Sequence, residues 1–271
     1  TVNCAASSGA FNTSEVATAN LVTATVTMSG ASAGNYTLGA TGTSVSSTSR
    51  TASANITPAP LTVTALNQSM VLHGLVPSLT FKIDGFVNGE GSSVLTMQPT
   101  CTTTGTSTSP VVVTGYPITC SGATAANYTF TYVNGTLTIT YAAPGGACDG
   151  DASHQVLQPI NTTGTMSVFK MGSTVPTKFR VCDASGASIG TPGVVTGYGL
   201  VAAANSSSIS VDEDAYSTTP DLAFRWDPAG QQWIFNQSTK SNPSLNKTNT
   251  IYYFAINLND GTSILFQYGL K

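Results

Sequence analysis

Apolar and hydroxyl side chains alternate over short stretches of this chain. The clearest are residues 22–28, 61–65 and 137–140, each of which can place one face in a core and the other in water. Shorter stretches of the same kind are residues 168–170, 178–181, 223–226 and 233–236. Frequent Thr, Val, Gly and Ser, with interspersed Pro, disfavour helices. The pattern predicts an all-β chain made of stacked β-sandwiches.

Two hairpins are predicted near the carboxyl end. Residues 250–258 and 262–270 are β-branched and aromatic runs joined by the sequence Asn-Asp-Gly, in which glycine can take the positive φ of a tight turn. Residues 224–226 and 233–235 flank a turn that opens with Asp227 and Pro228. We therefore expect the chain to end in a closed β domain.

A nine-residue motif occurs twice. It reads SGASAGNYT at residues 29–37 and SGATAANYT at residues 121–129, and an Asn-x-Thr strand follows each copy. The spacing is that of one small β-sandwich. Too few residues precede the first copy to form the strands that precede the second, so we expect residue 1 to lie in the middle of a domain.

Two proline-containing segments divide the chain. Residues 58–60 (PAP) predict a stiff, extended joint, and residues 142–146 (AAPGG) predict another. Two basic residues precede the second segment and seven follow it. We expect three domains arranged as an extended rod: a partial domain at 1–60, a complete Thr-rich domain at 61–143 and an aromatic-rich domain at 144–271.

These segments resemble known families. Residues 84–90 (DGFVNGE), 127–129 (NYT) and 132–137 (YVNGTL) resemble the MBG domain of large bacterial surface proteins. Residues 70–75 (MVLHGL) depart from the usual Tyr-Gly-Asp start of that domain. The preceding residues, with NYTL at 35–38 and ANITP at 54–58, are similar to the second half of a YDG repeat. The sequence GSTVPTKF at 172–179 resembles the PxKF domain. The resemblance implies Ig-like stalk or adhesin modules without an enzymatic role.

Composition narrows the set of partners. Only 8% of the 271 residues are charged, and the formal net charge is -3; soluble proteins average about 25%. Nine basic residues cannot neutralise a run of phosphates, so we expect no nucleic acid partner. No apolar run approaches the roughly 18 residues of a membrane span. We expect a secreted or cell-surface protein that does not insert into the membrane.

Five cysteines without a Cys-x-x-Cys spacing favour disulfides in an oxidising compartment over zinc. Cys101 and Cys120 lie on neighbouring predicted strands, and Cys148 and Cys182 bracket the first strands of the last domain. Each disulfide would stabilise its domain by roughly 3 to 4 kcal/mol. Cys4 is left over. It is either a free, buried thiol or the partner of an upstream cysteine, and we favour the second because secreted chains seldom leave an odd thiol.

Asn-x-Ser/Thr sequences are candidate glycosylation sites. They occur at Asn12, Asn35, Asn127, Asn161 and Asn246, and also at Asn55, Asn67, Asn134, Asn205 and Asn236. The alternative is chance, since Ser and Thr are so frequent, and the bacterial resemblance favours it. Residues 102–108 are further candidates for O-linked sugars.

Few residues suit catalysis or metal binding. The two histidines, His73 and His154, are expected on the surface, and catalysis by a serine needs a histidine held near the nucleophile. We therefore expect no enzyme and no cofactor. Calcium is the one ion with candidate ligands; turns and a solvated loop are the alternatives for these residues, which are Asp149, Asp151, Asp212 and Asp214.

Two further kinds of site have structural alternatives. Lys82 and Lys178 lie in predicted strands and could form amide crosslinks, but ordinary lysines with a wet ammonium group fit the pattern better. Trp226 and Trp233 could stack on a glycan. Alternation places them on the same faces as Phe224 and Phe235, however, which favours core packing.

Taken as one chain, these features predict a structural stalk or filament element. Its expected partners are neighbouring copies or domains of the same protein, joined by strand addition at the open edges of the partial first domain. The alternative is an adhesin whose terminal domain binds surface carbohydrates.

Overall fold

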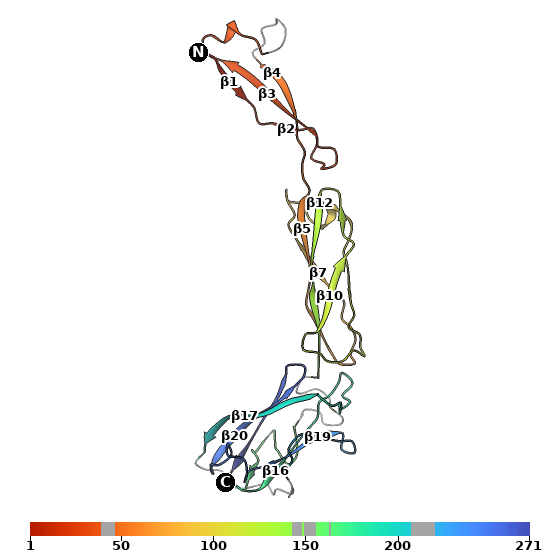
Figure 1. Cartoon of the computed structure of the whole chain (residues 1–271), viewed down its shortest axis with the longest axis vertical. Coiled ribbons are helices and arrows are strands. Elements are labelled where there is room, and N and C mark those ends of the chain that lie inside the picture. The colour runs from red at the N-terminus through yellow and green to blue at the C-terminus, as the bar shows by residue number, and fades with distance from the viewer. Residues whose placement is uncertain (39–46, 143–147, 149–155, 163, 207–219) are drawn as a thin grey trace. The chain divides into compact units, whose positions relative to one another are not determined.

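The computed structural model describes residues 1–38, 47–142, 148, 156–162, 164–206 and 220–271 (Figure 1). Its regular elements are strands, apart from the single-turn 3-10 helices η1 (Ala33–Asn35) and η2 (Ser92–Val94). The predicted all-β class is confirmed. No helix in this described part has the length and hydrophobicity to span a bilayer.

The chain folds as two compact units. Unit 1 comprises Thr1–Ala65, Thr80–Thr102 and Thr119–Asn134, and unit 2 comprises Leu66–Leu79, Thr103–Ile118 and Gly135–Lys271. The sequence between Ala59 and Thr140 contributes strands to both units. The division into three domains and the extended rod stay predictions.

In unit 1 the first sheet is built around β3. Strand β3 pairs antiparallel with three neighbours. The four strands are β1 (Asn3–Ala6), β2 (Ala10–Phe11), β3 (Leu21–Ser29) and β4 (Ser47–Ser53). Residues of β3 are alternately exposed and half-buried. The alternation predicted for residues 22–28 is therefore present, but none of these side chains is fully buried.

The second sheet of unit 1 has the order β12-β5-β7. Its strands are β5 (Ala59–Ala65), β7 (Phe81–Asp84) and β12 (Tyr128–Val133). Strand β5 runs parallel to β12 and antiparallel to β7. Its alternate residues Leu61, Val63 and Ala65 are buried, as their spacing predicts. Strands β8 (Leu95–Met97) and β11 (Thr124–Ala125) form a separate antiparallel pair.

A further sheet has the order β6-β13-β10-β9. It contains β6 (Gln68–Val71), β13 (Gly135–Thr140), β10 (Tyr116–Ser121) and β9 (Thr100–Thr103). Strand β13 pairs parallel with β6 and antiparallel with β10. Leu137 and Ile139 of β13 are buried. A disulfide joins Cys101 of β9 to Cys120 of β10, with 4.0 Å between their Cα atoms.

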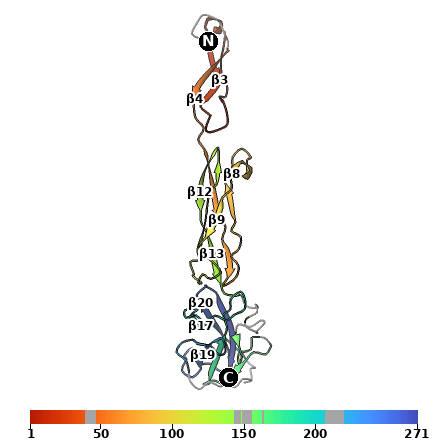
Figure 2. The ribbon, with the colours of Figure 1, turned by 90° about the vertical axis from the view of Figure 1, so that its right-hand side faces the viewer.

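The carboxyl-terminal part of unit 2 is a β-sandwich of two four-stranded sheets. Figure 2 labels its strands β17, β19 and β20. One sheet has the order β14-β16-β19-β18 and the other β15-β21-β20-β17. The strands are β14 (Val156–Leu157), β15 (Val168–Phe169), β16 (Thr174–Phe179), β17 (Val195–Asn205), β18 (Arg225–Asp227), β19 (Gln232–Ser238), β20 (Thr250–Leu258) and β21 (Ser263–Leu270). Both predicted hairpins, β18–β19 and β20–β21, are confirmed.

Aromatic rings fill the space between these two sheets. The ring of Tyr198 on β17 stacks on Phe254 of β20, with 5.6 Å between centroids. The same ring lies 5.2 Å from Phe235 of β19 in the opposite sheet. Because such pairs add to the free energy gained by burying apolar area, the aromatic core holds the two sheets together.

One buried amide satisfies two phenols in this core. The Oε1 atom of Gln237 accepts hydrogen bonds from the hydroxyls of Tyr198, at 2.7 Å, and Tyr268. Burial raises the pKa of both tyrosines, so both stay protonated and act as donors. Gln237 itself is buried. Its amide oxygen therefore determines whether two hydroxyl groups in the core are paired.

We predict that Gln237→Leu lowers the free energy of unfolding by about 2 to 6 kcal/mol, because two buried hydroxyls lose their shared acceptor at about 1–3 kcal/mol each. Denaturant titration measures this loss. Adding Tyr198→Phe and Tyr268→Phe removes the orphaned hydroxyls and should recover part of the stability. Unchanged stability of the single variant would contradict the importance of this network.

Candidate functional site

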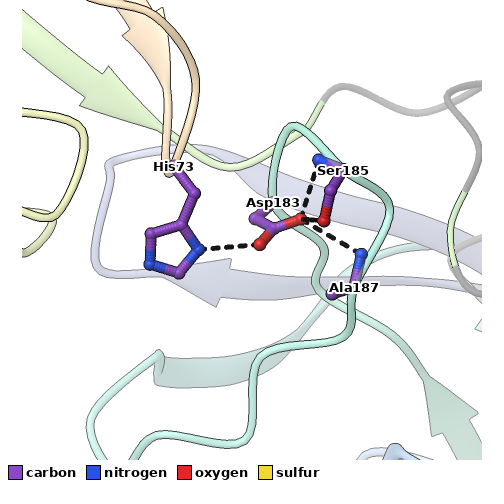
Figure 3. A network of polar contacts seen from close by, with 4 residues as sticks. All are labelled: His73, Asp183, Ser185 and Ala187. Atoms are coloured by element: carbon purple, nitrogen blue, oxygen red, sulfur yellow. Dashed lines mark hydrogen bonds and ion pairs between the residues drawn. The ribbon is translucent and has the colours of Figure 1, made fainter.

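His73 makes a polar contact with a distant loop. It follows β6 in a left-handed turn, with φ of 61°, and the amide of Gly74 closes the turn by donating to the carbonyl of Val71. The Nδ1 atom of His73 lies 2.7 Å from Oδ2 of Asp183 (Figure 3). A carboxylate can only accept, so Nδ1 is the donor.

Asp183 organises the loop that follows Cys182. Its Oδ1 atom accepts from the amide and hydroxyl of Ser185, at 2.8 and 2.7 Å, and from the amide of Ala187, at 3.1 Å (Figure 3). The side chain is only 6% exposed. Burial alone would raise the pKa of Asp183, but the hydrogen bonds from Ser185, His73 and Ala187 outweigh it and lower the pKa.

Three backbone amides and one phenol add to this contact. The amide of Ala184 donates to the carbonyl of Leu72 at 3.0 Å, and the amide of Ala142 donates to the carbonyl of Cys182 at 2.8 Å. Tyr141 donates from its amide to Asp260 at 2.9 Å and from its hydroxyl to Asn259 at 2.8 Å. We call this set the joint; its side chains are those of His73, Tyr141, Asp183, Asn259 and Asp260.

The joint connects four segments of unit 2. Residues just after β6 and just after β13 are tied to the loop after β16 and to the turn between β20 and β21. Burial and the charge of Asp260 raise the pKa of Tyr141 to about 12. The phenol therefore stays protonated, and remains a donor to Asn259, up to strongly alkaline pH.

The hydrogen bonds of the joint connect segments of the chain and do not form the arrangement that nucleophilic catalysis needs. In a Ser-His-Asp triad the imidazole lies between the serine and the carboxylate and takes the serine proton. Here the hydroxyl of Ser185 and the ring of His73 both donate to Asp183. The carboxylate lies in the middle, so no base is placed at the hydroxyl.

Trp226 and Trp233 lie together at one side of the sandwich, with 5.6 Å between ring centroids. Trp233 is buried and its Nε1 donates to the carbonyl of Ile189 at 2.8 Å, so this ring serves the core. Trp226 is half-buried and packs against Gly190, where a Cβ would lie 2.2 Å from the indole. Both tryptophans line a cavity of about 660 Å³ with Tyr198, Phe224 and Phe235.

The structure pairs Cys101 with Cys120 and Cys148 with Cys182, the two pairs that the sequence singles out. Cys4 has no disulfide partner among the described residues and is exposed on β1. The alternative of a buried free thiol is therefore wrong. Strand β1 lies in a sheet without a buried layer, and this accounts for the exposure.

The candidate glycosylation sites differ in accessibility. Asn12, Asn35 and Asn246 are exposed, whereas Asn127 and Asn161 are half-buried. The side chain of Asn12 holds its own loop by donating to the carbonyl of Thr18, and Oδ1 of Asn127 accepts from the amide of Val16.

Lys82 forms an exposed ion pair with Asp84 at 2.9 Å, so it is not the buried lysine that a crosslink requires. The calcium candidates Asp149, Asp151, Asp212 and Asp214 lie outside the described residues, as does His154.

Neither Asp183 nor Tyr141 is predicted from the sequence as a site residue. The sequence Asp-Ala-Ser-Gly at 183–186 is typical of an Asx turn, in which an aspartate accepts from the backbone two residues on. That signal could have identified the loop. It carries no information on His73, which is 110 residues away in the sequence.

Comparison with known families identifies one segment. Residues 61–138 match the family model described as MBG domain (YGX type). The predicted MBG resemblance of this segment is confirmed, and the match includes residues 70–75, where the sequence departs from the usual start. The YDG and PxKF resemblances of the flanking segments stay predictions. No curated protein matches the chain significantly.

Solved structures give distant likenesses. One is to the N-terminal eight Ig domains of Down Syndrome Cell Adhesion Molecule isoform 1.30.30, at 10% identity and a TM-score of 0.24, over 92% of this chain and 30% of that one. A second is to protocadherin gammaB7 EC3-6, at 13% identity and a TM-score of 0.24, over 99% of this chain and 67% of that one. A third is to the protocadherin gammaB4 extracellular domain, at 12% identity and a TM-score of 0.23, over 99% of this chain and 45% of that one. These scores are too low to bear on function.

We predict that Asp183→Asn makes the unfolding free energy less dependent on acid pH. Because the folded-state pKa of Asp183 lies below its usual 3.8, the carboxylate contributes stability above that value, and the contribution disappears as pH falls through the folded-state pKa. In denaturant titrations at pH 7, 5 and 3, the free energy of unfolding of wild type should exceed that of Asp183→Asn by an amount that decreases as the pH falls.

His73→Asn is the matched control for that series. Asparagine tolerates the left-handed turn, and the substitution removes only one of the donors to Asp183. The side chain of His73 is 48% exposed, so the loss in unfolding free energy should stay below about 1 kcal/mol. An advantage of wild type over Asp183→Asn that is constant from pH 7 to 3 would contradict the role given to the carboxylate.

Proposed function

We propose that this chain is a non-enzymatic structural module of a large secreted or surface-attached bacterial protein, in which it acts as a load-bearing stalk or assembly element. The MBG domain at residues 61–138 supports this, because the sequence resemblance is to modules of bacterial surface proteins. The two disulfides fit an oxidising, extracellular compartment.

The observation that carries the proposal is the pairing of the strands at the start and end of the MBG domain. Its first strand, β5, pairs in parallel with β12, from Ala59↔Tyr128 to Thr64↔Val133. Its last strand, β13, pairs in parallel with β6, from Leu137↔Gln68 to Thr140↔Val71. A pull on the two ends draws each parallel pair in opposite directions along the strands. All hydrogen bonds of a pair are then loaded together instead of breaking one after another.

The joint extends this arrangement toward the carboxyl-terminal sandwich. Leu72 and His73 follow β6, and Tyr141 and Ala142 follow β13, and all four are hydrogen-bonded to residues of the sandwich. Load that reaches the end of β13 is therefore shared between the covalent chain and several hydrogen bonds. This supports a mechanical role for the chain as a whole.

Single-molecule pulling tests the proposal. Pulled from its ends, the MBG domain should unfold at a force several-fold higher than when handles at Asn67 and Thr136 pull β6 and β13 apart from one end. These two residues are adjacent, since the amide of Thr136 donates to Oδ1 of Asn67 at 2.9 Å. Handles that do not use cysteine keep both disulfides intact. Equal unfolding forces in the two geometries would remove the mechanical proposal.

The cavity at Trp226 favours a second function, the binding of carbohydrate. Its volume of about 660 Å³ falls within the roughly 300–1,000 Å³ of ligand sites, and the half-buried indole offers a flat surface to a sugar ring.

We predict for this second function that Trp226→Ala reduces glycan binding at least about tenfold on a glycan array and by calorimetry. Tyr253→Ala is the control, because Tyr253 is an exposed aromatic residue of the same sandwich that does not line this cavity. Absence of any glycan signal for the wild-type chain would exclude this function.

A further inference from the structure

Strand β17 is an edge strand of unusual composition. It lies at the end of the sheet order β15-β21-β20-β17, next to β20 (Figure 1). Its 11 residues, VTGYGLVAAAN, include no charged residue and no proline. Natural edge strands are usually short or carry lysine or proline, which prevent pairing with other chains. Strand β17 is long and carries neither lysine nor proline, and its two register irregularities leave the stretch from Ala202 to Asn205 regular.

The second half of β17 is accessible from both faces. All residues from Leu200 to Asn205 are exposed, and Val201 retains 64% of its accessible surface. Among the described strands only β20 pairs with β17, up to the register pair Asn205↔Thr250. The register shifts near Val195 and Val201, but it is regular from Ala202 onward. Among the described residues, the regular stretch from Ala202 to Asn205 therefore has a partner strand on one side only.

Apolar side chains on the outer face of the sheet adjoin this edge. Val201, Tyr253 and Leu265 are 64%, 37% and 71% exposed, and they line a shallow cavity of about 430 Å³. Tyr253 lies opposite Ala202 in the register, and Leu265 lies one strand further into the sheet. The apolar surface therefore reaches the edge itself.

We propose that β17 is an assembly edge that pairs antiparallel with β17 of a second copy of this chain. A two-fold axis places a strand opposite itself, which requires a self-complementary sequence. An uncharged strand meets this requirement because no like charges face each other. The part of each apolar patch that lies on the edge strand, at Val201 and Ala202, then becomes part of the contact between the copies. This inference rests on the proposed assembly role and names the surface and the partner for it.

Sedimentation of the full chain over a range of concentrations tests the proposal. In a Cys4→Ser background, which prevents a disulfide through the exposed thiol, we expect a reversible dimer of twice 27.7 kDa. Val201→Lys should weaken it about 10- to 100-fold, because each copy then carries a lysine on the pairing strand, the charge by which natural edge strands prevent pairing. Leu265→Lys is the matched control: it is equally exposed and apolar on the same face but lies away from the edge, so the dimer should persist.

Hydrogen exchange supplies a second measurement. Amides of β17 that point away from β20 should become protected as the concentration rises, in wild type and Leu265→Lys but not in Val201→Lys. A chain that stays monomeric, a dimer that Val201→Lys leaves intact, or protection in dilute solution of the β17 amides that point away from β20 would each overturn the proposal. Pulling of single molecules does not depend on dimers, so a monomer that resists end-to-end force would remove the assembly edge and leave the load-bearing role.

Discussion

In a chain with so few charges, the buried carboxylate of Asp183 determines how several distant segments of unit 2 meet. A buried carboxylate is tolerable only when its oxygens are well supplied with donors. Oδ1 accepts from three donors of its own loop, and Oδ2 accepts from His73. One oxygen therefore shapes the loop, and the other is presented to the turn after β6. The backbone hydrogen bond from Ala184 to Leu72 fixes the same two segments at a second point.

The aromatic core of the sandwich follows the same rule with neutral groups. Tyr198 lies between the sheets and stacks on Phe254, yet its hydroxyl needs an acceptor. Gln237 supplies that acceptor for Tyr198 and also for Tyr268. The core thus combines apolar packing with one shared polar centre, and the polar centre fixes the positions of the rings.

The sequence predicts elements where the information is local. Residues 61–65 alternate apolar and hydroxyl side chains and lie in β5. Residues 233–236 include large apolar side chains and lie in β19. The two disulfides follow from cysteines near predicted strands. Strand β17 is not predicted, because its glycines and alanines show no alternation and its pairing depends on β20, some 50 residues later. The joint is missed for a similar reason, since the partners of His73 and Tyr141 are more than 100 residues away.

The protonation behaviour of the joint has a consequence for the surroundings in which the protein works. Tyr141 loses its proton only near pH 12, and Asp183 gains one only below its usual value of 3.8. The phenol contributes stability that is lost as pH rises from about 10 toward 12, and the carboxylate contributes stability that is lost in strong acid. Between these limits the two groups keep their charge states. In a medium that no cytoplasm buffers, the hydrogen bonds of the Tyr141 phenol and the Asp183 carboxylate would persist through both moderate acidification and moderate alkaline exposure.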